Sequence, residues 1–134
     1  MSRKLARESA FKLIYQIPFH GSLPISEVVE NYSVCEEDYA KLAPNELEYV
    51  DMCVKGCFDN IEEIDSKISS SLKNWTIERL SKVNLAILRL SLSEMSYADV
   101  PFQVSINEAV ELAKKFSDDE APAFVNGVLA DVIK

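Results

Sequence analysis

The sequence predicts an all-α fold of six or seven helices, and three observations lead to that prediction. Hydrophobic residues make up 48% of the 134 residues, which is enough for a packed core. Only three glycines and five prolines are present, so few tight turns can form. Apolar residues recur every three or four positions, which is the period of a helix with one buried face. We expect one domain over residues 1–134.

The first predicted helix covers residues 3–17. Its buried stripe consists of Ala6, Ala10, Leu13, Ile14 and Ile17. We expect Pro18 to end this helix, because a proline disfavours helical backbone at the residue before it. A short second helix is predicted to open at Pro24, and the acidic residues 33–43 are predicted to form a solvated linker.

A third helix is predicted to open at Pro44, and four further helices are predicted after it. The helical period continues from Pro44 to Leu72, and we divide this segment at Asn60, which has Glu63 three positions on. Thr76 is predicted to cap the next helix, an apolar and therefore central one. The pair Val100–Pro101 is predicted to stop it.

The last two helices are predicted from a capping pattern and a proline. Ser105 with Glu108 forms a capping box for a helix that runs to Phe116, and Pro122 opens the final helix. Gly127 lies inside that helix, where glycine costs about 1 kcal/mol relative to alanine. We expect a close approach of another helix to explain this glycine.

The cysteine and histidine content predicts reduced thiols and no metal site. Three cysteines (Cys35, Cys53 and Cys57) are a poor disulfide framework, and His20 alone does not complete a zinc site. We expect buried thiols in a reducing cytoplasm. The sequence has no apolar run as long as a membrane span and no secretion signal, which also indicates the cytoplasm.

Positive charge is concentrated at the start of this acidic chain. The net charge is −8, yet residues 1–12 carry four basic side chains and one acidic one, and the remainder carries ten and twenty-one. Arginine offers planar donors to phosphates, and Arg and Phe stack on unpaired bases. Cations at a helix N-terminus also oppose the macrodipole, so stability alone does not favour them. Nucleic-acid binding is therefore one interpretation, and an ordinary solvated helix start is the other.

The residues that catalysis requires are scarce. One histidine gives little support for a triad, no glycine-rich phosphate loop is present, and the carboxylates fall at predicted caps and solvent faces. We therefore expect a binding protein that is not an enzyme and that needs no cofactor.

Three blocks of sequence carry a family resemblance. They are RKLARESA at 3–10, VNLAILRL at 83–90, and a third block made of DVPF at 99–102, INEA at 106–109, ELAK at 111–114 and FVNGVL at 124–129. In this order they resemble the NusB family of transcription antitermination proteins. The resemblance implies two small helical bundles packed together. It also implies binding of boxA-type single-stranded RNA from ribosomal RNA operons, together with NusE, a small-subunit ribosomal protein, in a complex that suppresses premature termination by RNA polymerase.

The resemblance also implies which residues form the functional surfaces. Carried over by position, the RNA contacts are Arg3, Lys4, Arg7, Arg89, Phe116, Glu120 and Phe124. Tyr15 and Glu78 match positions near the partner surface. Leu5 stands where relatives often have another arginine, so the basic run is thin, and we expect NusE to supply much of the affinity.

Two alternatives and one open question remain at this stage. A helical adaptor would bind proteins through its acidic face and never bind RNA. A stand-alone relative of the N-terminal RNA-binding domain of ribosomal RNA cytosine methyltransferases would share the fold. The sequence leaves open whether the chain is a monomer or a homodimer.

Overall fold

The computed structural model describes residues 2–20, 39, 41–73 and 76–133, and in these ranges it contains six α-helices, one 3₁₀ turn and no strand. The elements are α1 (Ser2–His20), α4 (Pro44–Asp59), α5 (Ile61–Ser70), η1 (Ile77–Arg79), α6 (Lys82–Tyr97), α7 (Phe102–Phe116) and α8 (Ala121–Val132). The predicted all-α class is confirmed. The short helix expected at Pro24 and most of the linker 33–43 lie outside the described residues. None of the described helices is long and apolar enough to cross a membrane.

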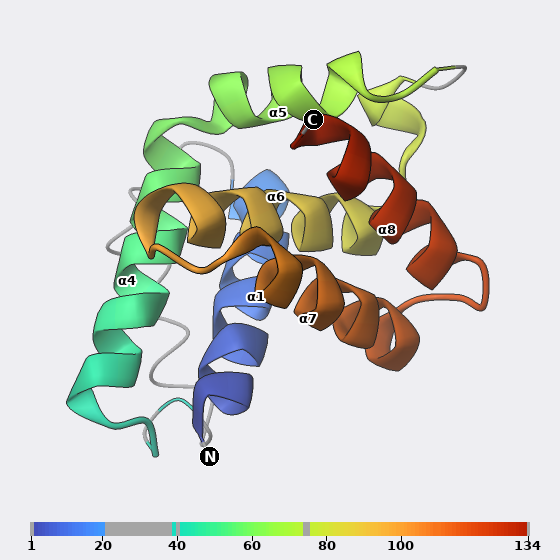
Figure 1. Cartoon of the computed structure of the whole chain (residues 1–134). Helices are drawn as coiled ribbons and strands as arrows, with labels where there is room; N and C mark the ends of the chain where they lie inside the picture. The colour runs from blue at the N-terminus through green and yellow to red at the C-terminus, as the bar shows by residue number, and fades with distance from the viewer. Residues whose placement is uncertain (1, 21–38, 40, 74–75, 134) are drawn as a thin grey trace.

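Helix α6 is the centre of the fold, as predicted. Residues 85–94 are all buried, so α6 is covered on every side over this stretch. Helices α1 and α4 pack against it and against each other, and α5, α7 and α8 pack against the rest of its surface (Figure 1). The result is two groups of helices that share α6.

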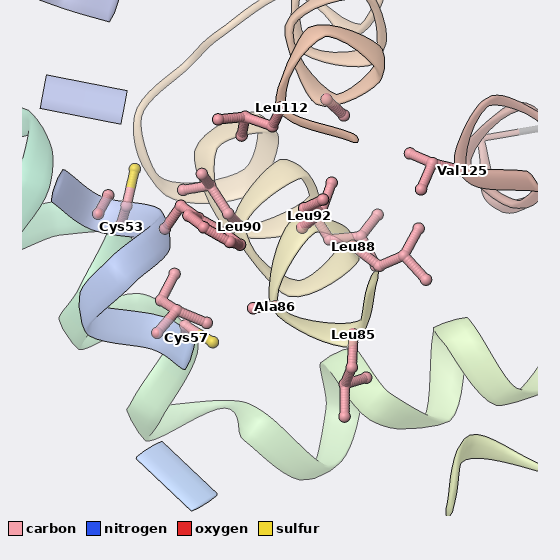
Figure 2. Packing of buried hydrophobic residues seen from close by; sticks show 14 of the residues in the cluster. Cys53, Cys57, Leu85, Ala86, Leu88, Leu90, Leu92, Leu112 and Val125 are labelled. Carbon is pink, nitrogen blue, oxygen red and sulfur yellow. The ribbon is translucent and has the colours of Figure 1, made fainter. Parts of the chain in front are cut away.

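The side chains of α6 reach into both groups. Leu88 points toward Val125 of α8, and Leu85 points toward α5 (Figure 2). Cys53 and Cys57 of α4 lie beside α1 in the same view. The predicted stripe of α1 is also confirmed where side chains are described: Ala6, Ala10, Leu13 and Ile14 are each 0% exposed. Such burial of apolar surface stabilises the fold by roughly 25 cal/mol per Å².

The first helix is longer than predicted. It continues past Pro18 to His20. A proline removes one backbone hydrogen bond, but its fixed φ is itself helical. The prediction that Pro18 ends α1 was therefore wrong.

One predicted cap is confirmed in position and another is not. Asn60 is the N-cap residue of α5, as predicted, but its side chain makes no capping bond there and instead donates to the Gly56 carbonyl of α4 at 2.9 Å. Thr76 precedes only the 3₁₀ turn. The cap of α6 is Ser81, whose hydroxyl oxygen accepts from the Asn84 backbone N–H at 3.1 Å.

The capping box predicted at Ser105 was also wrong. Helix α7 begins at Phe102, directly after Pro101, whose fixed φ leads into the helix. Ser105 therefore lies inside the helix and is fully buried. Helix α8 begins at Ala121, one residue before the predicted Pro122.

The close helix approach is found at a different glycine from the one predicted. A Cβ atom added at Gly127 would meet nothing within 4 Å, so no neighbouring helix requires this glycine. A Cβ atom added at Gly56 would overlap the ring of Tyr97, where α4 passes the end of α6. Gly56 therefore permits the α4–α6 contact.

We expect opposite effects from alanine at these two glycines. Gly127→Ala should raise the free energy of unfolding by about 1 kcal/mol, because alanine is the better helix former and its methyl group is unobstructed. Gly56→Ala should lower it by about 1–3 kcal/mol, because the Tyr97 ring must move. Urea unfolding measures both, and equal effects at the two positions would contradict this assignment.

The two described cysteines are buried thiols, as predicted. Both are 0% exposed, and burial raises the pKa of Cys53 to about 12 and that of Cys57 to about 11. The reactive thiolate form is therefore suppressed at neutral pH.

We expect Cys53 and Cys57 to resist alkylation in the folded protein at pH 8 and to react once urea unfolds it. Peptide mass spectrometry after iodoacetamide treatment locates the label. Rapid labelling of either residue in the folded protein at pH 8 would contradict the raised pKa values.

Candidate nucleic-acid interface

A buried carboxylate lies behind the start of α1. Glu94 of α6 is 1% exposed, and its oxygens accept from Arg7 Nε at 2.9 Å, from the Tyr49 hydroxyl, and from Ser105 Oγ at 2.5 Å. Ser105 also lies 2.7 Å from the Ser91 hydroxyl. One carboxylate thus joins α1, α4 and α7 to α6.

The protonation states of this cluster are fixed by its surroundings. Burial by itself would lower the pKa of Arg7, but the neighbouring Tyr49 and Glu94 raise it above its ordinary value, so the guanidinium stays charged. Burial also raises the pKa of Tyr49, so its hydroxyl keeps its proton and donates to Glu94.

Two arginines that the family resemblance assigns to RNA lie in the protein interior. Arg7 is 5% exposed and also places Nη1 at 3.4 Å from Glu108. Arg89 is 9% exposed and binds Asp65 of α5 through Nε at 2.9 Å and Nη2 at 2.7 Å. Both guanidinium groups therefore hold helices together, and an RNA contact by either one stays a prediction.

Arg3 and Lys4, the two basic residues in the first turn of α1, are exposed. The guanidinium carbon of Arg3 lies 4.3 Å from the centre of the Tyr49 ring, so the arginine stacks over the same tyrosine that bonds Glu94. Lys4 is exposed beside α7. The cluster around Glu94 thus supports the surface on which these two cations lie.

A groove runs between α1 and α7. The α1–α7 groove is lined by Lys4, Arg7, Glu8, Glu108, Glu111, Leu112, Lys114 and Lys115. Lys115 Nζ crosses to Glu8 at 2.8 Å, and Lys114 Nζ lies 3.3 Å from Glu111. The ring of the predicted site residue Phe116 lies 5.0 Å from the ring of Phe11.

A second groove brings together two further predicted residues. The α6–α8 groove is lined by Arg79, Leu80, Ser81, Asn84, Asp118, Glu120, Ala121 and Phe124. Glu120 is exposed and Phe124 is half-buried. Asp118 Oδ1 accepts from the backbone N–H groups of Glu120 at 3.1 Å and Ala121 at 3.0 Å, which fixes the start of α8.

The residues predicted for the partner surface lie on separate elements. Tyr15 is half-buried on α1, with its ring 6.4 Å from that of Phe11. Glu78 is exposed in η1, next to Arg79 of the α6–α8 groove.

Three basic residues of these grooves were not predicted from the sequence: Arg79, Lys114 and Lys115. Both lysines lie in the last turn of a helix, where a positive charge interacts favourably with the helix dipole, so the sequence indicates no further role for them. Only the packing of α7 near α1 shows where they point.

These features define an all-α binding protein with exposed cations and aromatic rings along its grooves. The NusB family model matches residues 4–134, and the chain belongs to the NusB family. The predicted family is confirmed, and a family of transcription antitermination proteins agrees with the expected binding protein rather than an enzyme.

Similar proteins match along nearly their whole length. The transcription antitermination protein NusB of Thermoanaerobacter sp. (strain X514) is 42% identical over 100% of this chain and 91% of its own. That of Clostridium botulinum (strain Kyoto / Type A2) is 44% identical over 99% of this chain and 100% of its own.

Solved structures share the fold. NusB of T. maritima superposes with a TM-score of 0.86 at 28% identity, over 98% of this chain and 90% of that chain. A crystal structure of the antitermination factors NusB and NusE in complex with double-stranded RNA gives a TM-score of 0.84 at 31% identity, over 97% of this chain and 94% of that chain.

We expect Glu94→Gln to lower the free energy of unfolding by about 3–5 kcal/mol, because it removes the buried counterion of Arg7 and leaves only the more exposed Glu108 beside that guanidinium. The matched control is Glu63→Gln on α5, whose exposed partner Lys67 lies 3.6 Å away, and whose loss should cost less than about 1 kcal/mol. Urea unfolding compares the two variants. Equal stabilities would show that the buried pair does not hold these helices.

Proposed function

We propose that this chain is a transcription antitermination factor that binds RNA together with NusE. The observation that carries the proposal is the shared fold with a NusB that was crystallised with NusE and RNA. The RNA is a boxA-type element of ribosomal RNA operons, and the assembled complex suppresses premature termination by RNA polymerase. As a factor in bacterial transcription, the chain works in the cytoplasm.

The RNA-binding face consists of the exposed start of α1 together with Phe116 at the end of α7 and Phe124 of α8. Arg3 and Lys4 offer charge to phosphates, and Phe116 and Phe124 offer rings on which unpaired bases stack. Glu120 lies beside Phe124 in the α6–α8 groove, where its carboxylate can accept from base amino groups. Arg7 supports this face from behind through its buried ion pair with Glu94, and Arg89, which is paired with Asp65 of α5, stays a predicted RNA contact.

NusE binds at the surfaces that include Tyr15 and Glu78. The chain carries a net charge of −8, so its own attraction for RNA is weak. A partner that adds RNA contacts would raise the affinity of the pair above that of either protein. Both alternatives are less well supported. The relatives matched along their length are named antitermination proteins, not methyltransferases, and an adaptor that never binds RNA does not agree with the shared fold of a NusB crystallised with RNA.

We expect the paired change Arg3→Ala and Lys4→Ala to weaken binding of single-stranded boxA-type RNA in the presence of NusE. The slope of log Kd against log salt should shrink by about 1.4, because each phosphate contact on a single strand contributes about 0.7. Phe124→Ala should weaken binding by about 1–3 kcal/mol without changing that slope.

Fluorescence titration over a range of salt concentrations, with and without NusE, measures these effects. Lys67→Ala on α5 is the control, since α5 lies at the opposite end of the molecule from the start of α1 (Figure 1). A slope near zero for the unsubstituted protein would contradict the proposal and favour the adaptor.

A further inference from the structure

We infer that the α1–α7 groove binds RNA backbone phosphates, with Lys115 as its central cation and Glu8 as an internal competitor that lowers RNA affinity. The inference rests on the proposed function and adds two residues to it. Lys115 comes from the last turn of α7, and Glu8 from the second turn of α1, so the groove draws its side chains from two helices far apart in the sequence.

Cations occupy both walls of the α1–α7 groove. Lys4 lines the α1 wall and is exposed, and Lys115 lines the α7 wall with 54% of its side chain exposed. The groove is also lined by Glu8, Glu108 and Glu111, so a phosphate there would meet ammonium groups from both helices in competition with these carboxylates. Each phosphate that a lysine neutralises releases counterions, which adds to the affinity for RNA.

The groove also continues the aromatic part of the proposed RNA face. The ammonium of Lys115 lies 5.3 Å from the centre of the Phe116 ring, and that ring lies 5.0 Å from Phe11. A base stacked on Phe116 would place its own backbone phosphate close to Lys115. Stacking and phosphate contacts commonly occur together in proteins that bind single strands.

The ion pair between Lys115 and Glu8 is asymmetric. Only 12% of the Glu8 side chain is exposed, whereas 54% of the Lys115 side chain is exposed. Lys115 can turn toward a phosphate, but Glu8 stays in the groove. An ion pair with one exposed partner contributes little to stability, so exchanging its carboxylate for a phosphate costs little.

The negative charge of Glu8 remains after that exchange. It lies next to the site of the phosphate and repels it, so it lowers the affinity of the groove. A favourable interaction with the C-terminal dipole of α7 accounts for a lysine in this turn. It does not account for a lysine that crosses to a carboxylate of another helix.

The test compares two lysine–glutamate pairs in the same RNA titration with NusE. Lys115→Ala should reduce the salt slope by about 0.7 and weaken binding roughly tenfold, the loss of one charge-assisted contact. Glu8→Gln should strengthen binding severalfold. The matched controls are Lys67→Ala and Glu63→Gln on α5, where the lysine is 51% exposed, and both should leave RNA binding unchanged.

Three results would overturn the inference, and they are distinguishable. Lys115→Ala and Lys67→Ala could give the same slope of log Kd against log salt, while the paired Arg3 and Lys4 changes reduce it. In that case the groove is not a phosphate site, and the proposed function stands. If Glu8→Gln binds no more tightly than Glu63→Gln, Glu8 is not a competitor. If the unsubstituted chain with NusE does not bind RNA, the proposed function fails and the groove inference fails with it. Thermal unfolding of each variant confirms folding, and the slope decides the outcome for Lys115.

Discussion

The ion pair between Glu94 and Arg7 is the interaction on which the arrangement of the helices around α6 depends. A buried charge costs several kcal/mol unless a counterion and hydrogen bonds compensate for it. Glu94 receives a donor from each of three other helices: Arg7 of α1, Tyr49 of α4 and Ser105 of α7. Any packing that separates one of these helices from α6 leaves a polar group unpaired, which disfavours it. The first turn of α1 is therefore held in place by a polar cluster as well as by apolar packing, and Arg3 is stacked on that same cluster.

The helical period predicted the helices well, and local capping patterns predicted their ends poorly. A period of 3.6 residues depends only on which face is buried, so it indicated α4, α6 and α8 correctly. A hydroxyl or amide near a helix end has several possible partners, and the sequence does not show which one is closest. Ser105 looked like a cap, yet its hydroxyl bonds Glu94, eleven positions away on α6. Asn60 does precede α5, yet its side chain bonds the Gly56 carbonyl of α4.

The same reasoning explains which parts of the candidate site were predictable. The cluster of basic residues at the start of the chain is a property of composition, so the exposed Arg3 and Lys4 were found directly. Arg7 is indistinguishable from them in sequence, and its partner Glu94 lies 87 positions away. Arg89 differs from a surface arginine only through Asp65, 24 positions before it. Lys115 belongs to the candidate site only because α7 passes close to α1, which no local pattern indicates.

RNA binding is compatible with the negative net charge of this protein, because only the charges near the binding site act strongly on a phosphate. At physiological ionic strength the screening length is about 8 Å, so acidic groups on α5, at the opposite end of the molecule (Figure 1), barely act on a phosphate near the start of α1. What matters there is the balance within the α1–α7 groove. Of its four cations, Arg7 is held in buried ion pairs, and Lys114 and Lys115 have carboxylates within 3.3 Å. RNA must therefore exchange these carboxylates for phosphates instead of meeting free charge. This exchange reduces non-specific attraction and makes the affinity depend on a partner and on bases that stack, which is how a weakly basic surface becomes selective.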